Sequence, residues 1–325
     1  MREHYLIKEN DLIPLIGAHL FGVIDRGTNV LQIRSITGCP LKCIYCSVDE
    51  GEGSKKRNTY QVETNYLLKE INEIIKIKGI NDAEAHIDGI GEPLLNKDIV
   101  NLVKGLRKNK NIKIISMQTN GILLTEKLLY ELENAGLDRI NLSINSLGPE
   151  TAKELSGISG YDINKIKLLA QNISKSKIKL LIAPVIVPGY NENIDDLIIF
   201  AKSINARLGI QKYEHYKHGR KLKAKEWTWY KFYNYLKELE KKHETKLILK
   251  KEEFKIHKTN SLPIVFKKNE TVKGKVVLPG WLSNEVIISA KNRLITVFDC
   301  NAKINDLVKA KIIKTKHNLY LAKRA

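Results

Sequence analysis

Apolar positions along the 325-residue chain follow two alternating spacings. Short apolar runs of the β type are followed by longer stretches in which apolar residues recur every three or four positions, as on one face of a helix. The stretch 65–79 shows the second spacing, with Leu67, Ile71 and Ile74 on one face. The predicted strands are 30–37, 83–90, 112–121, 138–145, 177–189 and 208–213. The predicted helices are 65–79, 97–109, 125–136, 164–174 and 194–205.

Strands that alternate with helices of this length predict parallel strands joined by right-handed crossovers. Thr125 is placed to cap the start of one helix, and Gly136 is placed to end it. Six strand–helix units are too few for an eight-fold barrel. We therefore expect an α/β fold that consists of a partial (β/α)6 barrel of the TIM type.

Polar and glycine-containing segments follow each predicted strand, where parallel barrels carry their functional residues. Cys39, Cys43 and Cys46 follow the first strand, and Gly91 and Glu92 follow the second. Later strand ends contribute Asn120, then Ser143 and Asn145, then 188–191, and finally Glu214 and His215. We expect these residues to gather at one rim of the barrel.

The composition and the spacing of apolar residues change after the sixth predicted strand. Residues 214–257 are basic and aromatic and then helical, whereas 258–325 contain short β-type runs divided by Gly, Asn and Pro. The predicted domains are an N-terminal extension (1–28), the barrel core (29–213), a connector (214–257) and a small all-β barrel of about five strands (258–325).

Composition narrows the class of protein. No run of eighteen apolar residues is present, so we expect no membrane span. The first residues are charged and lack a cleavage site for a signal peptide, so we expect the cytoplasm. In that compartment the four cysteines serve as thiols, ligands or nucleophiles rather than as disulfides.

The net charge of +19 predicts a polyanionic partner. Nucleic acid is the first candidate, and an anionic membrane surface is the second. Residues 258–325 hold 14 Lys or Arg and 4 Asp or Glu, a net charge of +10. Residues 212–225 hold six basic residues and one Glu, a net charge of +5, and aromatic residues are interleaved with them. This concentration favours nucleic acid over a thermophile-like, evenly charged surface.

Three of the four cysteines stand in the order C-x3-C-x2-C, within "GCPLKCIYCS" at 38–47. Three neighbouring thiolates can hold three corners of a cubane iron–sulfur cluster and leave one iron open. A structural zinc ion is the alternative, and it needs a fourth ligand, for which Cys300 or a histidine would have to serve. No second pair of closely spaced ligands is evident in the sequence.

The sequence resembles the radical S-adenosylmethionine (SAM) enzymes over about 29–213. The resemblance is carried by the cysteine motif, "GIGEPLL" (89–95), "QTNG" (118–121) and "INLSIN" (140–145). It implies one 4Fe-4S cluster held by Cys39, Cys43 and Cys46, with SAM bound at the fourth iron. One electron would cleave SAM to methionine and a 5′-deoxyadenosyl radical.

The same resemblance implies contacts with SAM. Glu92 would hydrogen-bond the methionine amino group, and Gly91 would allow close backbone approach. Ser143, Asn145 and Asn120 would reach the ribose or the carboxylate, and Tyr45 would pack beside the adenine. The residue pattern itself leaves open that Asn120, Ser143 and Asn145 are turn formers. No catalytic residue of the protein follows from the sequence.

The C-terminal segment resembles the TRAM domain, a small OB-like barrel of RNA-modifying enzymes, in "VKGKVV", "EVIISAKNRLITVF" and "INDLVKAKIIKTKHNLYLA". The whole chain resembles an archaeal group of radical SAM proteins. These resemblances imply modification of an RNA nucleoside, in tRNA first, with ferredoxin or flavodoxin as electron donor. The alternatives are an activase or a peptide-modifying enzyme whose basic tail contacts a protein, and a zinc-containing RNA-binding module.

Overall fold

The computed structural model describes residues 2–325, and contacts group the chain into two units. The first unit contains Met1–Gly38, Lys55–Ile115 and Ile256–Ala325, and the second contains Cys39–Ser54 and Ser116–Lys255. Each unit brings together segments that lie far apart in the sequence. The domain boundaries expected from the sequence remain a prediction.

The first unit holds the beginning of the predicted parallel sheet. β3 and β6 are parallel, and β2 lies antiparallel beside β3. β3 alternates half-buried and buried residues, as a strand with two different faces does. The elements are β1 (Glu3–Ile7), η1 (Glu9–Asp11), β2 (Gly22–Asp25), β3 (Val30–Arg34), β4 (Thr37–Gly38), β5 (Asn58–Val62), α1 (Thr64–Lys78), β6 (Ala83–Ile87), β7 (Ile90–Gly91), η2 (Pro93–Leu95) and α2 (Ile99–Arg107).

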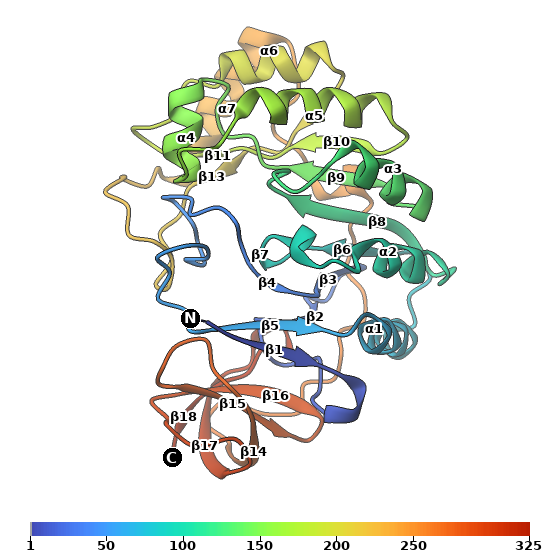
Figure 1. Ribbon diagram of the computed structural model, residues 1–325, viewed down its shortest axis with the longest axis vertical. Coiled ribbons are helices and arrows are strands. Elements are labelled where there is room, and N and C mark those ends of the chain that lie inside the picture. Colours follow the sequence, from blue (N-terminus) through green and yellow to red (C-terminus); the bar gives the residue numbers. More distant parts are fainter. Residues whose placement is uncertain (1) are drawn as a thin grey trace. The chain divides into compact units, whose positions relative to one another are not determined.

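The second unit continues the same alternation. β8 (Ile112–Thr119) begins in the first unit and ends in the second, where β8, β9, β10 and β12 are joined by parallel pairing in that order. Figure 1 shows the helices α3 to α7 beside these strands. The elements are α3 (Glu126–Ala135), β9 (Arg139–Leu142), α4 (Pro149–Ser156), α5 (Ile163–Lys175), β10 (Lys179–Ile182), β11 (Val185–Ile186), α6 (Asp195–Ser203), β12 (Arg207–Leu208), β13 (Gln211–Lys212), α7 (Trp229–His243) and η3 (Lys251–Phe254).

The predicted fold class is confirmed, but several element boundaries differ and some elements, such as β2, were not predicted. Thr125 caps α3 through a hydrogen bond from the Leu128 N–H, and Gly136 ends it in the left-handed conformation. The predicted strands 30–37, 83–90, 177–189 and 208–213 are each divided into two short strands. α4 was not predicted, because its eight residues are too few to reveal helical spacing. No helix among residues 2–325 has the length and apolar character needed to cross a membrane.

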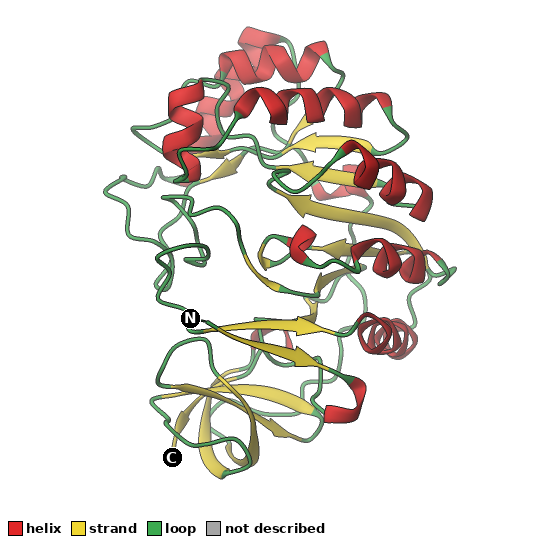
Figure 2. Ribbon diagram, in the orientation of Figure 1, coloured by secondary structure: helices red, strands yellow, loops and turns green. Residues whose placement is uncertain are grey.

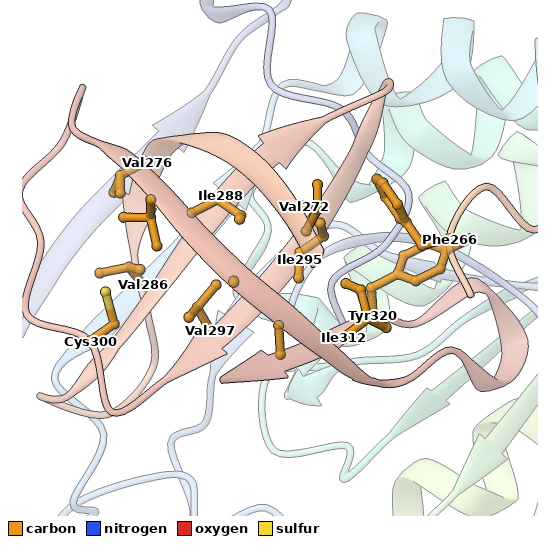
Figure 3. Packing of buried hydrophobic residues seen from close by; sticks show 13 residues of the cluster. Phe266, Val272, Val276, Val286, Ile288, Ile295, Val297, Cys300, Ile312 and Tyr320 are labelled. Carbon is orange, nitrogen blue, oxygen red and sulfur yellow. The ribbon is translucent and has the colours of Figure 1, made fainter. Parts of the chain in front are cut away.

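The C-terminal segment forms the expected all-β barrel, which is closed and has the strand order β14-β15-β16-β18-β17. Its core contains Val286, Ile288, Ile295 and Tyr320, and the buried thiol of Cys300 packs among them (Figure 3). Cys300 is therefore part of an apolar core. The elements are β14 (Thr271–Pro279), β15 (Glu285–Ala290), β16 (Arg293–Phe298), β17 (Leu307–Lys314), η4 (Lys316–Asn318) and β18 (Leu321–Arg324).

A buried ion pair between α1 and β2 is bonded to the segment that precedes this barrel. The Lys78 ammonium lies 2.7 Å from Asp25 Oδ1, and both side chains are fully buried. Lys78 also donates to the Asn260 carbonyl, 2.5 Å away, and Asp25 Oδ2 accepts from the Leu262 N–H at 2.7 Å. Because both charges are paired and hydrogen-bonded, the cost of burying them is offset. The segment 260–262, which leads into the barrel, is thereby fixed to β2 and α1.

Replacing Lys78 by methionine is expected to lower the free energy of unfolding by about 3–5 kcal/mol, because Asp25 is left as a buried charge without its cation. Urea unfolding followed by circular dichroism measures the change. Lys76→Met, at an exposed position of the same helix, is the matched control and should cost less than about 0.5 kcal/mol. Equal effects of the two substitutions would show that the pair does not stabilise the unit.

Candidate functional site

The entry to the cysteine loop is a close contact between two glycines of the first unit. Gly38, the last residue before Cys39, pairs with Gly91 of β7. Both have positive φ, and a Cβ on Gly91 would lie 1.8 Å from the Gly38 carbonyl oxygen. A side chain is thus excluded at Gly91. This contact with Gly38 is a different role from the approach to SAM that the resemblance implies for Gly91, and the approach to SAM remains a prediction.

Glu92 directly follows this glycine contact and is 1% exposed. Its backbone N–H donates to the Gly38 carbonyl at 2.7 Å, and its Oε1 accepts from the Leu94 N–H at 3.1 Å. The second bond caps η2. The carboxylate is therefore held in one orientation at the end of β7. An ammonium group is a suitable further partner for a buried carboxylate, and the contact with SAM remains a prediction.

The cysteine loop, residues 39–54 of the second unit, has neither helix nor strand and is drawn as a loop in Figure 2. A hydrogen-bond donor reaches each of its three sulfurs. Asn120 Nδ2 donates to Cys39 at 3.6 Å, the Glu50 N–H donates to Cys46 at 3.5 Å, and the Tyr45 hydroxyl is hydrogen-bonded to Cys43. Donors to sulfur stabilise thiolate ligands and set the reduction potential of iron–sulfur clusters.

The surroundings of Cys43 disfavour its thiolate form in the absence of metal. Burial, followed by the charge of Cys46, raises the pKa of the Cys43 thiol to about 11, while the hydrogen bond from Tyr45 and the charge of Arg220 act in the opposite direction. Without metal, Cys43 therefore keeps its proton at neutral pH. Two neighbouring thiolates that repel each other are stabilised together by a cation, so metal binding must release this proton.

The number and spacing of the three cysteines in the sequence suit a cluster with separate metal positions. Within residues 2–325, no three His, Cys, Asp or Glu side chains converge as a single metal ion requires. In a cubane cluster each thiolate binds a different iron, so the sulfurs need not meet at one point. A structural zinc ion would need four converging ligands. The loop supplies three thiols of the kind that such a cluster binds, and their role as its ligands remains a prediction.

Arg220 lies in the connector and holds the cysteine loop through hydrogen bonds. This role was not predicted from the sequence. The backbone N–H of Arg220 donates to the Cys46 carbonyl at 2.8 Å. Its guanidinium donates to the carbonyls of Glu50 (2.8 Å) and Glu52 (3.0 Å), to that of Lys42, and to Asp49 at 3.1 Å. The planar fork of donors suits such a set of acceptors. In the sequence, Arg220 is one of several cations in a basic run, so no signal separated it from them.

Tyr45 is fixed by a second set of contacts in the same unit. Its ring packs in an apolar cluster with Leu155 and Val187, and its hydroxyl accepts from Asn145 Nδ2 at 2.5 Å. Asn145 Oδ1 accepts from Val185 N–H at 2.8 Å, and the Asn145 carbonyl accepts from Asn191 Nδ2 at 2.6 Å. Asn145 therefore positions Tyr45. Asn191, which is buried, belongs to the segment 188–191 that the sequence places after the fifth strand, and the structure shows that it bonds to Asn145.

The remaining predicted residues lie at strand ends of the second unit. Ser143 follows β9, and its hydroxyl accepts from Gln118 Nε2 at 2.9 Å. Asn120 follows β8, and its Oδ1 accepts from the Ile122 N–H at 3.0 Å. Asn120 thus makes the local bond of a turn former and also reaches Cys39, whereas the bond of Ser143 joins the ends of two neighbouring strands. Their contacts with SAM remain predictions.

Replacing Arg220 by alanine is expected to loosen the cysteine loop and to lower the affinity for the cluster by roughly tenfold or more. The measurements are iron retained against a chelator after anaerobic reconstitution, and the reaction rate of the cysteines with a thiol reagent in the apoprotein. Arg220→Lys keeps the charge without the fork and should give an intermediate result. Lys221→Ala is the control, because that ammonium donates to the carbonyls of Tyr216 and Lys217. Wild-type iron retention and thiol reactivity in Arg220→Ala would contradict this role.

Replacing Gly91 by alanine is expected to destabilise the chain by about 3 kcal/mol, since the new Cβ forces β4 and β7 apart. Gly79→Ala is the control, because Gly79 also has positive φ but has nothing within 4 Å of an added Cβ. It should cost about 1 kcal/mol, the conformational penalty alone. Unfolding in urea compares the two, and similar losses would show that the contact with Gly38 is not responsible.

Comparisons with known proteins agree with this geometry. A sequence model described as the radical SAM superfamily matches residues 33–201. An uncharacterized protein of Methanocaldococcus jannaschii is 42% identical, and the match covers 96% of this chain and 79% of that protein. The GTP 3′,8-cyclase of Clostridium botulinum strain Hall is 35% identical over 54% of this chain and 54% of the cyclase. The chain thus spans about half the length of that cyclase.

Among solved structures, Streptococcus suis SuiB bound to S-adenosylmethionine has a TM-score of 0.51 and 22% sequence identity. The similarity covers 67% of this chain and 50% of SuiB. At this identity the similarity concerns the fold. It places the partial α/β barrel of this chain among barrels of the same architecture.

Proposed function

This chain belongs to the radical SAM superfamily, and we propose that it uses radical SAM chemistry to modify a nucleoside in RNA, with tRNA as the first candidate. The family's cofactors are a 4Fe-4S cluster and SAM. Cys39, Cys43 and Cys46 would hold the cluster, and Glu92 would receive the amino group of SAM. An electron donor such as ferredoxin or flavodoxin would be a further partner.

When bound, the cluster supplies the electron that cleaves SAM and so provides the radical for hydrogen abstraction. The residues of this chain orient the cluster ligands and keep the carboxylate of Glu92 away from water. Arg220 and Tyr45 fix the loop that carries the ligands, and Asn145 holds Tyr45 in place. Burial of Glu92 keeps its carboxylate out of water, where its interaction with an ammonium group is stronger.

The observation that carries the RNA proposal is a set of lysines on the outside of the C-terminal barrel. Lys273 of β14 lies directly opposite Lys309 of β17, and Lys311 of β17 lies opposite Lys323 of β18. All four side chains are exposed. Like charges placed directly across a sheet destabilise it. A phosphate backbone on this face would remove the repulsion, so a polyanion is the partner that best explains the arrangement.

The fold of the barrel supports the same proposal. A closed five-stranded barrel is the architecture expected of a TRAM or OB-like domain, and such barrels bind oligonucleotides on their surface. The connector adds the exposed lysines Lys217, Lys221, Lys223 and Lys225. Two separate basic segments would let the chain hold RNA at more than one point.

A free purine nucleotide is the second candidate substrate. Its support is the 35% identity with a GTP 3′,8-cyclase over about half of this chain. Both candidates present a nucleoside to the radical. They differ in length, since an RNA can extend along both lysine pairs of the barrel and a mononucleotide occupies a single site. RNA is therefore favoured by the lysine pairs, and a mononucleotide by the cyclase similarity alone.

Replacing Lys273, Lys309 and Lys311 by alanine together is expected to weaken tRNA binding and to reduce the slope of log affinity against log salt by about 1 per lysine that contacts a phosphate. Filter binding at several salt concentrations measures both quantities. The full chain is used, because the segment before the barrel bonds to Asp25 and Lys78, and a truncation from Lys258 onward would expose this buried pair.

Two variants control this experiment. Lys76, Lys104 and Lys110 replaced by alanine remove the same charge from exposed positions elsewhere in the first unit. Cys43→Ala should abolish release of 5′-deoxyadenosine and keep tRNA binding. An unchanged affinity in the barrel variant would refute an RNA-binding role for this face. Deoxyadenosine from Cys43→Ala would refute the cluster assignment.

A further inference from the structure

A pocket of about 320 Å³ lies beside the start of α7 in the second unit. Its walls are the segment after β12, the aromatic first turns of α7 and a short stretch near Leu249. The residues that matter here are Lys212, Glu214, Trp229, Phe232 and Tyr233. A pocket of this volume accommodates a nucleobase or another small planar group.

Two aromatic side chains of this pocket, Trp229 and Tyr233, are not needed for packing of the helix core. α7 packs through Phe232, Leu236 and Leu239, which form its buried stripe. Trp229 and Tyr233 lie outside that stripe and are 51% and 42% exposed. Their rings stack on each other, with centroids 5.7 Å apart and planes 26° apart. A stacked pair of half-exposed rings offers a surface on which a further flat ring can stack.

The charges inside the pocket disfavour a phosphate there. The Lys212 ammonium lies 5.1 Å from the centre of the Trp229 ring, and its side chain is 4% exposed. It is paired with Glu214 at 3.6 Å and Glu226 at 3.4 Å. The cation is thus already neutralised by two carboxylates. A neutral aromatic ring with hydrogen-bonding edges fits this environment, whereas an anion would meet the carboxylates.

The surroundings of the pocket have the opposite character. The segment that leaves the pocket carries four exposed lysines, Lys217, Lys221, Lys223 and Lys225. A neutral, aromatic interior beside an exposed basic segment is the arrangement by which proteins bind single-stranded nucleic acid, with bases on aromatic rings and phosphates on cations. A protein partner would have no comparable need for both features together.

We propose that the pocket of α7 stacks an unpaired base of a single-stranded RNA segment, while the lysines of the connector contact the neighbouring phosphates. This inference rests on the proposed RNA substrate and names a site for it. Residues 212–220 lead directly from the pocket to Arg220, which holds the cysteine loop. A base held in the pocket is therefore bound by the same segment that fixes the cluster ligands.

The test uses the full-length protein and fluorescently labelled 12-nucleotide oligoadenylate and oligouridylate. Trp229→Ala and Tyr233→Ala are each expected to weaken binding roughly tenfold, because base–aromatic stacking contributes on that scale. Trp229→Phe keeps a ring and should bind close to wild type. The salt dependence should be unchanged in Trp229→Ala, since no phosphate contact is lost. Binding should also quench tryptophan fluorescence in the wild type and much less in Trp229→Phe.

Tyr130→Ala is the matched control, because Tyr130 is a 66% exposed tyrosine on α3 of the same unit and lies outside the pocket. Urea unfolding of each variant shows whether it is folded. Wild-type RNA affinity in folded Trp229→Ala and Tyr233→Ala would overturn the pocket assignment and leave the proposed RNA substrate standing. No binding of tRNA or of either oligonucleotide by the wild type would overturn both.

Discussion

The shape of the cysteine loop depends on one guanidinium group. The loop has no helix or strand, so its carbonyls must find donors elsewhere. Arg220 supplies them, with bonds to Glu50 and Glu52 and an ion pair with Asp49. Hydrogen bonds that involve a charged group contribute about 1.5–3 kcal/mol each, so several from one side chain can decide the conformation of a short loop. Whatever orders the connector therefore also orders the ligands of the cluster.

The type of reaction and the type of substrate are supported by different parts of the molecule. The spacing of three cysteines, the donors to their sulfurs and the family relationship all concern the radical step. The substrate proposal depends instead on the paired lysines of the barrel and on the aromatic pocket of α7. A carbon-centred radical distinguishes poorly between C–H bonds. Binding of the substrate at sites other than the cysteine loop would therefore select the C–H bond that reacts.

The sequence was most informative where the signal is local. Helical spacing, the Thr125 cap and the cysteine motif each involve residues a few positions apart, and all were visible without coordinates. Arg220 and the Lys78–Asp25 pair were not, because each acts on a segment far away in the chain. Within a basic run, the sequence does not distinguish the residue whose side chain holds a distant loop. The division of strands 177–189 and 208–213 was also hidden, since it reflects pairing between β11 and β13.

The position of the ion pair between Lys78 and Asp25 has a consequence for biosynthesis. Its outer partners, Asn260 and Leu262, are made long after the strands and helix that they complete. The early segments of the first unit must therefore leave the ribosome with a lysine and an aspartate whose final environment does not yet exist. Folding of this unit waits for late synthesis and involves contacts of high sequence separation, which form slowly. During that interval the nascent chain would be a natural client for chaperones that shield incomplete cores.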